Sequence, residues 1–513
     1  MRSLTYLIIG GLLFNLFFWN EKIGLNLILF DVFIVALLFR LYPYSFRSVY
    51  VKWLLLINGV SLVGIILSNS SLSLVSAIGS FTLLSMYIQY NHRSVVYALG
   101  SMATNLLLVP AMISEEWQSV PRSSAISISV RKIHWRLMLL PALLLMVFIV
   151  IYASANSVFS ASLVSVQQTL DRIAKLVFSG FSWNRILFIL LGIYLTALLI
   201  LKARITFFSR KDLESVDVLT RRKNFIGRQS PAFLSKLFMG KLAFQNMALK
   251  HEYKIGSISL LLLNLLLLYI NLIDINHIWL GESVGDGEPI YKKVHEGTEL
   301  LILSILLAMA VLLSFFKGNL NFYSQNKWLK AGAYVWIFQN AVLVGSVLLR
   351  DLHYIEKYGL AYKRIGVLFF LLLVLVGLFT IYVKISLRKS NYFLVKANAW
   401  FAVTLLSVAS LINWDSLIAR YNIEVHQGTR DIPFLLSLSD NTLPILDMNK
   451  DKLMSDSVRQ HAEIFFPEGI ESYLEKRKLE FIISQKENSW LSWNLADFKI
   501  KKYLNSQTNN SND

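Results

Sequence analysis

The chain has 513 residues, of which 55% are hydrophobic and only 16% are charged, and its mean hydropathy is +0.54. Soluble domains carry about 25% charged residues, so this composition argues against a water-soluble enzyme and indicates a multi-pass membrane protein. The net charge of +18 would suggest a nucleic-acid partner in a soluble protein, but the bases here lie in short loops between apolar runs. The sequence has no cysteine, which excludes disulfides, thiolate metal ligands and a cysteine nucleophile.

Apolar runs long enough to cross a bilayer, which takes roughly 17–25 residues, recur from the N-terminus to residue 412. Each is expected to be a helix, because backbone polar groups in lipid must be satisfied within the segment. The runs are Leu4–Trp19, Ile23–Phe39, Trp53–Leu67, Leu72–Tyr90, Val95–Ile113, Leu137–Tyr152, Ile186–Leu201, Ile255–Ile273, Thr298–Phe315, Ala331–Leu349, Ile365–Val383 and Tyr392–Ile412. The predicted fold is all-α: a polytopic transmembrane helix bundle of about 11–12 spans with a small polar C-terminal extension.

The distribution of charge predicts the orientation of the chain. Loop 202–254 carries 12 bases and 4 acids, whereas residues 415–513 carry 12 bases and 15 acids. By the positive-inside rule, the loop is expected in the cytoplasm and the extension on the other side. Five crossings before the basic loop 114–136 would place that loop outside, so four or five crossings remain open for the N-terminal part. The predicted organisation is 1–136, N-terminal transmembrane segments; 137–414, a transmembrane core; and 415–513, the polar extension.

Polar residues near the outer ends of the predicted spans are candidates for a binding site. His295 and Glu299 are four residues apart and share a helix face, where they could hold a divalent ion, relay a proton, or simply form a polar helix start. The residues between 352 and 364 combine bases, phenols, a histidine and a carboxylate, which indicates either a binding surface or interfacial anchors. The full candidate set is Asp274, His295, Glu299, Arg350, His353, Glu356, Tyr358, Tyr362, Lys363, Arg364, Asp415 and Arg420.

One carboxylate, Asp31, lies in the middle of a predicted span. A bare charge there costs at least about 2.5–3.5 kcal/mol, so we expect Asp31 to be protonated or paired within the bundle. An intramembrane carboxylate is also a functional-site candidate. The sequence contains no phosphate-binding glycine loop, nucleophile elbow or zinc-protease helix, and we predict no cofactor and no metal site.

Several short motifs suggest a family. They are Ala155–Phe159, Phe315–Tyr323, Tyr358–Val367, Ile418–Ile423 and Leu436–Pro444. With these motifs the chain resembles, over residues 137–450, the bacterial membrane family called domain of unknown function 4173, which is related to the 4153 group. It departs from the family pattern at Ser157 and Ala361, where proline and threonine are usual. The resemblance implies a multi-pass bacterial membrane protein and implies no reaction.

The predicted function is non-enzymatic: envelope sensing, assembly or maintenance in the bacterial cytoplasmic membrane. The lipid bilayer is the expected partner, nucleic acid is not, and the sequence names no protein partner. Two alternatives stay open. A small-solute transporter should gather polar groups at mid-membrane around broken helices. A membrane-embedded transferase acting on lipid-linked substrates should gather carboxylates and bases on one aqueous face.

Overall fold

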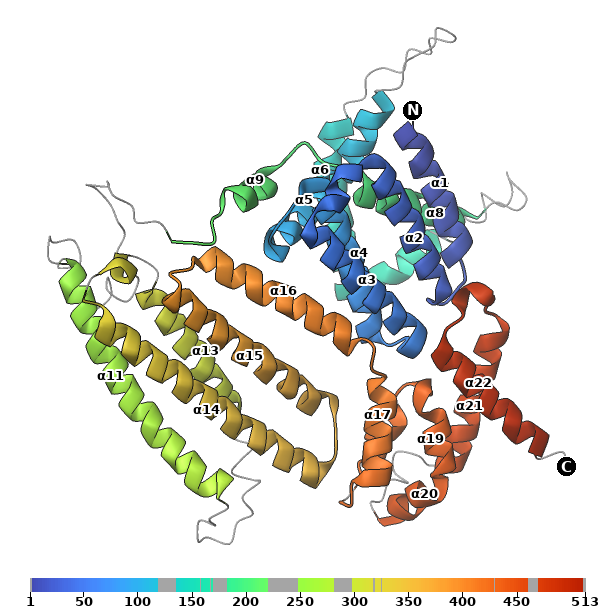
Figure 1. Cartoon of the computed structure of the whole chain (residues 1–513). Coiled ribbons are helices and arrows are strands. Elements are labelled where there is room, and N and C mark those ends of the chain that lie inside the picture. The colour runs from blue at the N-terminus through green and yellow to red at the C-terminus, as the bar shows by residue number, and fades with distance from the viewer. Residues whose placement is uncertain are drawn as a thin grey trace. The chain divides into compact units, whose positions relative to one another are not determined.

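A computed structural model describes most of the chain. The described residues are 2–118, 135–156, 158–166, 168, 182–219, 248–280, 298–316, 319–323, 325–428, 430–459 and 469–510. Helices dominate these ranges, and the β-structure in them is a single isolated bridge between Val218 and Lys389. The all-α fold class is therefore confirmed (Figure 1).

Each apolar run predicted from the sequence forms a helix. The helices are α1 (Arg2–Phe18), α2 (Leu25–Leu41), α3 (Val49–Ser68), α4 (Ser71–Tyr90), α5 (Val95–Gln118), α6 (Trp135–Ala155), α8 (Trp183–Ile200), α11 (Ala248–Asp274), α13 (Thr298–Phe315), α14 (Lys327–Tyr358), α15 (Tyr362–Ser386) and α16 (Asn391–Ala409). Within the described residues, eight helical segments are long and apolar enough to span a membrane, and three shorter apolar helices accompany them. By helix length and composition, the protein is a multi-pass membrane protein.

The chain forms two compact units that interleave along the sequence. Unit 1 consists of Met1–Asp212, Ser407–Leu411 and Ile482–Lys499. Unit 2 consists of Leu213–Leu406, Ile412–Phe481 and Ile500–Asp513. This division by contacts differs from the three segments that charge and hydropathy predict.

Small residues allow close helix packing in unit 1. A Cβ atom at Gly10 of α1 would lie 2.5 Å from the Thr196 side chain of α8, and one at Gly192 would lie 2.7 Å from Phe14. The helices α1 and α8 can therefore approach closely only because glycine occupies these positions, as is common between helices in lipid.

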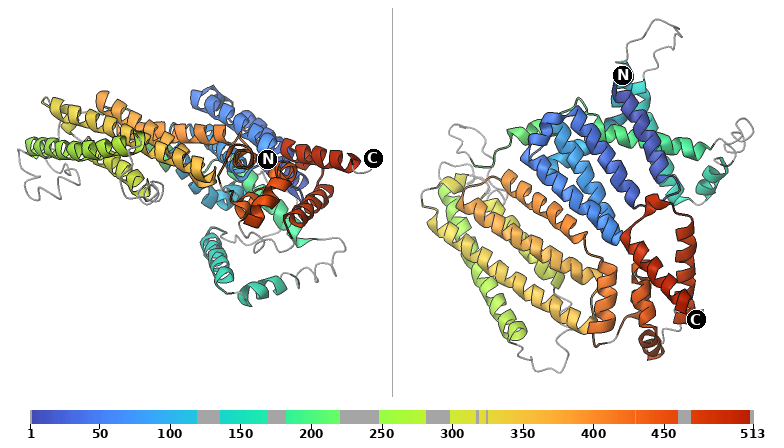
Figure 2. Two further views of the ribbon diagram at one scale, coloured as in Figure 1. Left: turned by 90° about the horizontal axis from the view of Figure 1, so that it is seen from below. Right: turned by 45° about the vertical axis from the view of Figure 1, so that its right-hand side comes forward.

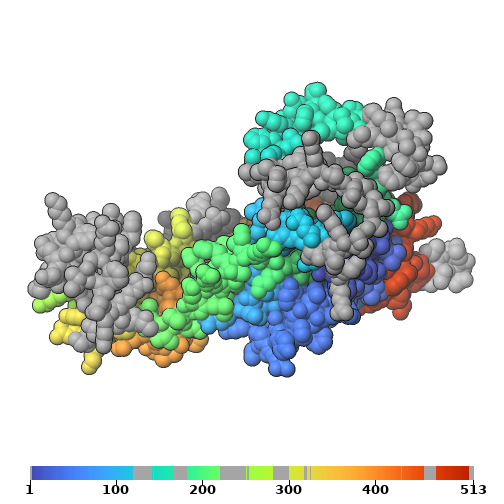
Figure 3. Space-filling model, turned by 90° about the horizontal axis from the view of Figure 1, so that it is seen from above, coloured from blue at the N-terminus to red at the C-terminus, as the bar shows by residue number. Residues whose placement is uncertain are grey.

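Hydrogen bonds between loops define the two ends of the unit 1 helices. At one end, Tyr42 donates to the Ile200 carbonyl at 3.2 Å, and the Tyr90 hydroxyl accepts from the Ala203 amide at 2.8 Å. At the opposite end, the Asn69 amide donates to the Ile23 carbonyl at 3.0 Å. The residues that follow α8 therefore lie against the end of α4, and Figure 3 shows the green segment next to the blue helices.

In unit 2, α14 packs against both α11 and α15 around a core that includes Leu260, Trp336, Val347 and Leu371. Figure 2 shows α14, α15 and α16 side by side. Polar side chains join α11 to α14 within this apolar packing: the Asn264 amide donates to the Gly332 carbonyl and the Asn271 amide to the Gln339 carbonyl, each at 3.0 Å.

The polar extension folds into short helices after residue 412. They are α17 (Trp414–Arg420), α18 (Ile432–Ser437), α19 (Leu443–Met448), α20 (Lys450–Arg459), α21 (Ile470–Lys486) and α22 (Leu495–Asn510). Their apolar side chains form a second core in unit 2, to which Leu435, Leu446 and Leu474 contribute. Ile365 of α15 belongs to the same core, so the part of the extension that belongs to unit 2 and the first turns of α15 are packed as one body.

Candidate functional site

An ion pair joins α11 to α14 at one end of the two helices. Arg350 donates from a terminal guanidinium nitrogen to Asp274 Oδ1, and the two side chains are only 13% and 6% exposed. A π-helical turn, Ile275–Trp279, begins directly after Asp274, and the Trp279 indole donates to Ser346 Oγ at 3.1 Å. Such turns are rare and frequently occur at functional sites. Two of the predicted site residues, from different predicted spans, are thus brought together.

The same helix end contains buried polar atoms without a hydrogen-bond partner among the described residues. They are Asp274 Oδ2, Arg350 Nε and Asp351 Oδ2. Asp351 is 8% exposed, and Arg364 is close enough to interact with it electrostatically. Unpaired buried polar atoms cost about 1–3 kcal/mol each, so one donor and two acceptors are held here at an energetic cost.

Among the described residues, the Arg364 guanidinium binds carbonyls at the end of α14 and not a carboxylate from another helix. It donates to the Tyr358 carbonyl at 2.9 Å and also to the Gly359 carbonyl, and it lies over the Tyr354 ring at 4.6 Å. The last carbonyls of a helix have no partner within the helix, and Gly359 leaves it with φ = +78°. We call Asp274, Arg350, Asp351, Tyr354, Tyr358 and Arg364 the α14-end cluster.

The other predicted site residues whose side chains the structure describes lie outside this cluster. His295 lies outside the described residues, and of Glu299 only the backbone, in α13, is described. His353, Glu356 and Lys363 are exposed and make no hydrogen bond or ion pair with the described residues. Arg420 approaches Glu424 one helical turn away at 3.9 Å, and both side chains are exposed.

Tyr362 and Asp415 belong to a second group of contacts, between the start of α15 and the extension. The Tyr362 hydroxyl donates to Asp415 Oδ1, and the Ser439 amide donates to Asp415 Oδ2 at 3.2 Å. Asp415 therefore joins the starts of α15 and α17 to the loop that follows α18.

Asn422 fixes the turn between α14 and α15 to the extension. Its side chain accepts from the Leu360 amide at 2.6 Å and donates to the Leu360 carbonyl at 2.8 Å. Arg477 of α21 donates to the Leu436 and Leu438 carbonyls and to Asp440, at 2.7–2.8 Å. We call Tyr362, Asp415, Asn422 and Arg477 the extension clasp.

In unit 1, a buried carboxylate contacts an imidazole, which in turn contacts a hydroxyl. Asp212 Oδ2 lies 2.9 Å from His92 Nδ1, and His92 Nε2 lies 2.8 Å from Ser101 Oγ. This is the order of groups in serine hydrolase triads. However, the three residues are only 0–5% exposed, and the short helix α9 (Phe207–Glu214), which supplies Asp212, also places Phe208 against Gly100 beside the hydroxyl.

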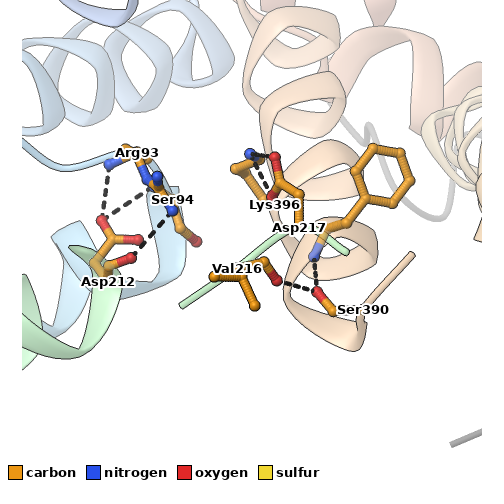
Figure 4. Close-up of polar contacts among 8 residues, drawn as sticks. Arg93, Ser94, Asp212, Val216, Asp217, Ser390 and Lys396 are labelled. Atoms are coloured by element: carbon orange, nitrogen blue, oxygen red, sulfur yellow. Dashed lines mark hydrogen bonds and ion pairs between the residues drawn. The ribbon is translucent and has the colours of Figure 1, made fainter. Parts of the chain in front are cut away.

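The segment that leads from unit 1 to unit 2 is fastened at both ends, each within its own unit (Figure 4). In unit 1, Asp212 Oδ2 also accepts from the Arg93 and Ser94 amides, at 2.7 and 3.2 Å. In unit 2, Lys396 Nζ contacts both Asp217 oxygens at 2.7–2.8 Å, and the Ser390 hydroxyl donates to the Val216 carbonyl. Through these hydrogen bonds, Asp212 also holds α9 against the residues that follow α4.

The comparisons with known proteins decide the family. The family model described as Domain of unknown function (DUF4153) matches residues 33–449, which is more than half of the chain. The chain belongs to this family. The label 4173 that the motifs suggested is related but different, so the predicted family is corrected to DUF4153. No curated protein and no solved structure matches this DUF4153 chain.

The DUF4153 match covers the α14-end cluster and most of the extension clasp, but it excludes Arg477 and Asp31. Asp31 is 2% exposed, and its two carboxyl oxygens accept from the Asn58 amide at 2.8 and 3.0 Å. Ser80 in turn donates to Asn58 Oδ1 at 2.9 Å. Among the described residues, the partner of Asp31 is an amide and not a base.

Some of these contacts left a signal in the sequence and others did not. The motifs at Tyr358–Val367, Ile418–Ile423 and Leu436–Pro444 each supply part of the clasp, so their joint occurrence could have indicated it. Asp351 is not among the predicted site residues: it follows Arg350 just past the predicted span Ala331–Leu349, where no local pattern marks it as buried. His92 and Asp212 are 120 residues apart, and an acid in a strongly basic loop was their one visible sign.

Proposed function

We propose that this DUF4153 protein acts in sensing or assembly at the envelope from the bacterial cytoplasmic membrane, with its polar extension as the working part. The observation that carries this proposal is the core shared by the extension and α15, in which Ile365 packs with Ile418, Leu435 and Leu474. Burying one such side chain stabilises by about 1.5–3 kcal/mol, so a shared core holds the extension firmly to the membrane helix.

The extension clasp supports the same proposal. Asn422 satisfies both backbone groups of Leu360, and Asp415 joins Tyr362 to Ser439. A load or ligand that moves the extension would therefore act on the ends of α14 and α15 directly. A sensor or an assembly factor needs such a rigid link, whereas an enzyme with a tethered soluble domain does not.

In unit 1, several polar groups inside the described spans are paired with one another, which favours this role over solute transport. Ser61, Ser76 and Ser407 form a closed triangle of hydroxyls at 2.8–3.2 Å, and Asp31 binds Asn58. A transport path would need polar groups directed toward substrate near broken helices. The charged groups of unit 2 gather at helix ends instead.

The test is complementation of cells that lack the protein, with entry of a membrane-impermeant dye as the readout of envelope integrity. We expect the wild-type chain and Lys389→Ala to restore the barrier. Asn422→Leu should reach the membrane in normal amount, make the extension sensitive to added protease, and fail to restore the barrier. If Asn422→Leu detaches the extension and still restores the barrier, the spans alone carry the function and the proposal is wrong.

A second candidate is a membrane-embedded transferase acting on lipid-linked substrates, which the contacts of Ser101, His92 and Asp212 favour. Ser101 Oγ would attack an acyl carbonyl of the lipid-linked substrate while His92 takes its proton and Asp212 orients the imidazole; His92 then returns the proton to the departing alcohol as the bond from the acyl carbon to that alcohol breaks. A fluorophosphonate probe tests this candidate on the purified full-length protein in lipid. Labelling that disappears in Ser101→Ala and falls in Asp212→Asn would support it, and an unlabelled wild-type protein would eliminate it.

A further inference from the structure

The segment Ile482–Lys499 of the extension belongs to unit 1, where it packs on the turn between α1 and α2 (Figure 1). The Leu25 amide, at the start of α2, donates to the Trp493 carbonyl at 3.1 Å. Glu21 accepts from the Ser489 amide at 3.1 Å and from the Ser492 hydroxyl. A Cβ atom at Gly24 would lie 2.6 Å from the Ser492 carbonyl, so the two backbones are in direct contact.

This packing uses one side of the segment and leaves large apolar side chains on the other. Leu491, Asn494 and Ala496 are buried. The exposed set consists of Ile482 at 42%, Ile483 at 50%, Trp490 at 67%, Trp493 at 43% and Phe498 at 50%. Two tryptophans and a phenylalanine within nine residues form an exposed apolar patch of the kind that marks an interaction surface.

The position of the patch indicates what covers it. Trp493 is hydrogen-bonded to the first residue of α2, so the patch lies at the level where the apolar helix begins. The neighbouring helices also expose apolar side chains, among them Leu12, Leu16 and Val32, as expected for surfaces in contact with lipid. Tryptophan is enriched at this depth in membrane proteins because its ring is apolar and its indole N–H needs a polar partner.

We propose that Ile482–Lys499 is an interfacial membrane anchor, whose Trp490, Trp493 and Phe498 side chains insert into the lipid headgroup region beside the start of α2. The extension then has two attachments: within unit 2 it is bonded to the α14–α15 turn, and within unit 1 this segment inserts into the membrane surface. The segment contains two bases, Lys486 and Lys499, and two acids, Glu487 and Asp497, so apolar insertion rather than attraction to anionic lipid holds it in place.

The experiment uses the natural absence of cysteine to place single nitroxide labels on the full-length protein in liposomes. The test position is Trp490→Cys, Leu16→Cys is the reference in contact with lipid, and Ser455→Cys is the reference exposed to water. Collision rates with oxygen and with a water-soluble nickel chelate report the depth of each label. Because Trp490 is 67% exposed, its replacement should leave the fold intact, which circular dichroism of each variant checks.

We expect the label at position 490 to collide with oxygen severalfold more, and with nickel severalfold less, than the label at 455. The values should be the same in zwitterionic liposomes and in liposomes that contain phosphatidylglycerol. Nickel collisions equal to those at 455 would place the segment in water and overturn the proposal. An immobile label shielded from both reagents would overturn it as well, because a second copy or another protein would then cover the patch.

Discussion

At the scale of single residues, the carboxyl group of Asp31 has a partner that tolerates a change of its charge. Asn58 donates to both of its oxygens, and an asparagine at position 31 would still offer one acceptor. We expect Asp31→Asn to insert and fold with a free energy of unfolding within about 1 kcal/mol of wild type, measured by thermal unfolding in detergent. Asp31→Leu is the control, because it leaves the buried Asn58 amide unpaired and should cost about 1–3 kcal/mol. Loss of folded Asp31→Asn would mean that a buried base holds the charge.

Unlike Asp31, neither Asp274 nor Arg350 should tolerate the loss of its charge, because both members of this pair are buried charges. Arg350→Met leaves an uncompensated carboxylate and should destabilise the protein by about 3–5 kcal/mol. Adding Asp274→Leu to this variant removes the uncompensated charge, and we expect most of the lost stability to return. Thermal unfolding of the wild type, both single variants and the double variant measures the coupling. Additive single effects would show that the two residues do not act as a pair.

At the scale of elements, the extension depends on a buried charge pair between α19 and α21. Lys478 lies 2.7 Å from Asp447, and Tyr503 and Gln507 of α22 also donate to this carboxylate. Burial raises the pKa of Asp447, but the hydrogen bonds from Lys478, Tyr503 and Gln507 outweigh it, so the pKa is lower than usual. Burial lowers the pKa of Lys478, but its contacts with Asp447 and Glu475 outweigh it, so the pKa is higher than usual.

Because of these two pKa shifts, we expect the extension to be most stable between an acid limit set by Asp447 and an alkaline limit set by Lys478. The contribution of Asp447 is complete above the unfolded carboxyl pKa of about 4 and is lost as the pH falls through the lower folded value. The contribution of Lys478 is complete below about pH 10 and is lost as the pH rises through the higher folded value. Thermal unfolding from pH 3 to pH 11 measures both limits. We expect Asp447→Asn to flatten the acid limit, and an unchanged acid limit in this variant would contradict the assignment.

The sequence predicts the helices well and the contacts between them poorly. In lipid, a long apolar run such as Ile365–Val383 satisfies its backbone polar groups by forming a helix, so the existence of α15 follows from hydropathy alone. The end of α14 does not: it continues to Tyr358 through charged residues that a hydropathy window excludes. Contacts such as Asn422 with Leu360 join residues 62 positions apart, and no local pattern encodes that partner.

At the scale of the whole molecule, the orientation across the membrane remains a prediction from charge. Within unit 1, the residues after α8 and the segment Ile482–Lys499 lie at opposite ends of the helices. From the charge of loop 202–254 and of residues 415–513, we expect a membrane-impermeant maleimide to label Ser455→Cys in intact cells and to spare Leu213→Cys until the cells are opened. The unmodified chain, which has no cysteine, is the control. Labelling of position 213 alone would mean that the orientation is inverted.

The interleaving of the two units has a consequence for biosynthesis. The turn between α1 and α2 leaves the ribosome long before its packing partner, which ends at Lys499. At about 5–20 residues per second, the roughly 470 residues between Gly24 and Ser492 take on the order of 25–95 s to synthesise. During that time, Glu21 and Gly24 face water or the insertion machinery without Ser492. The packing of α1 and α2 is therefore completed only after most of the extension has been made, and a ribosome that stalls within the extension leaves both units unfinished.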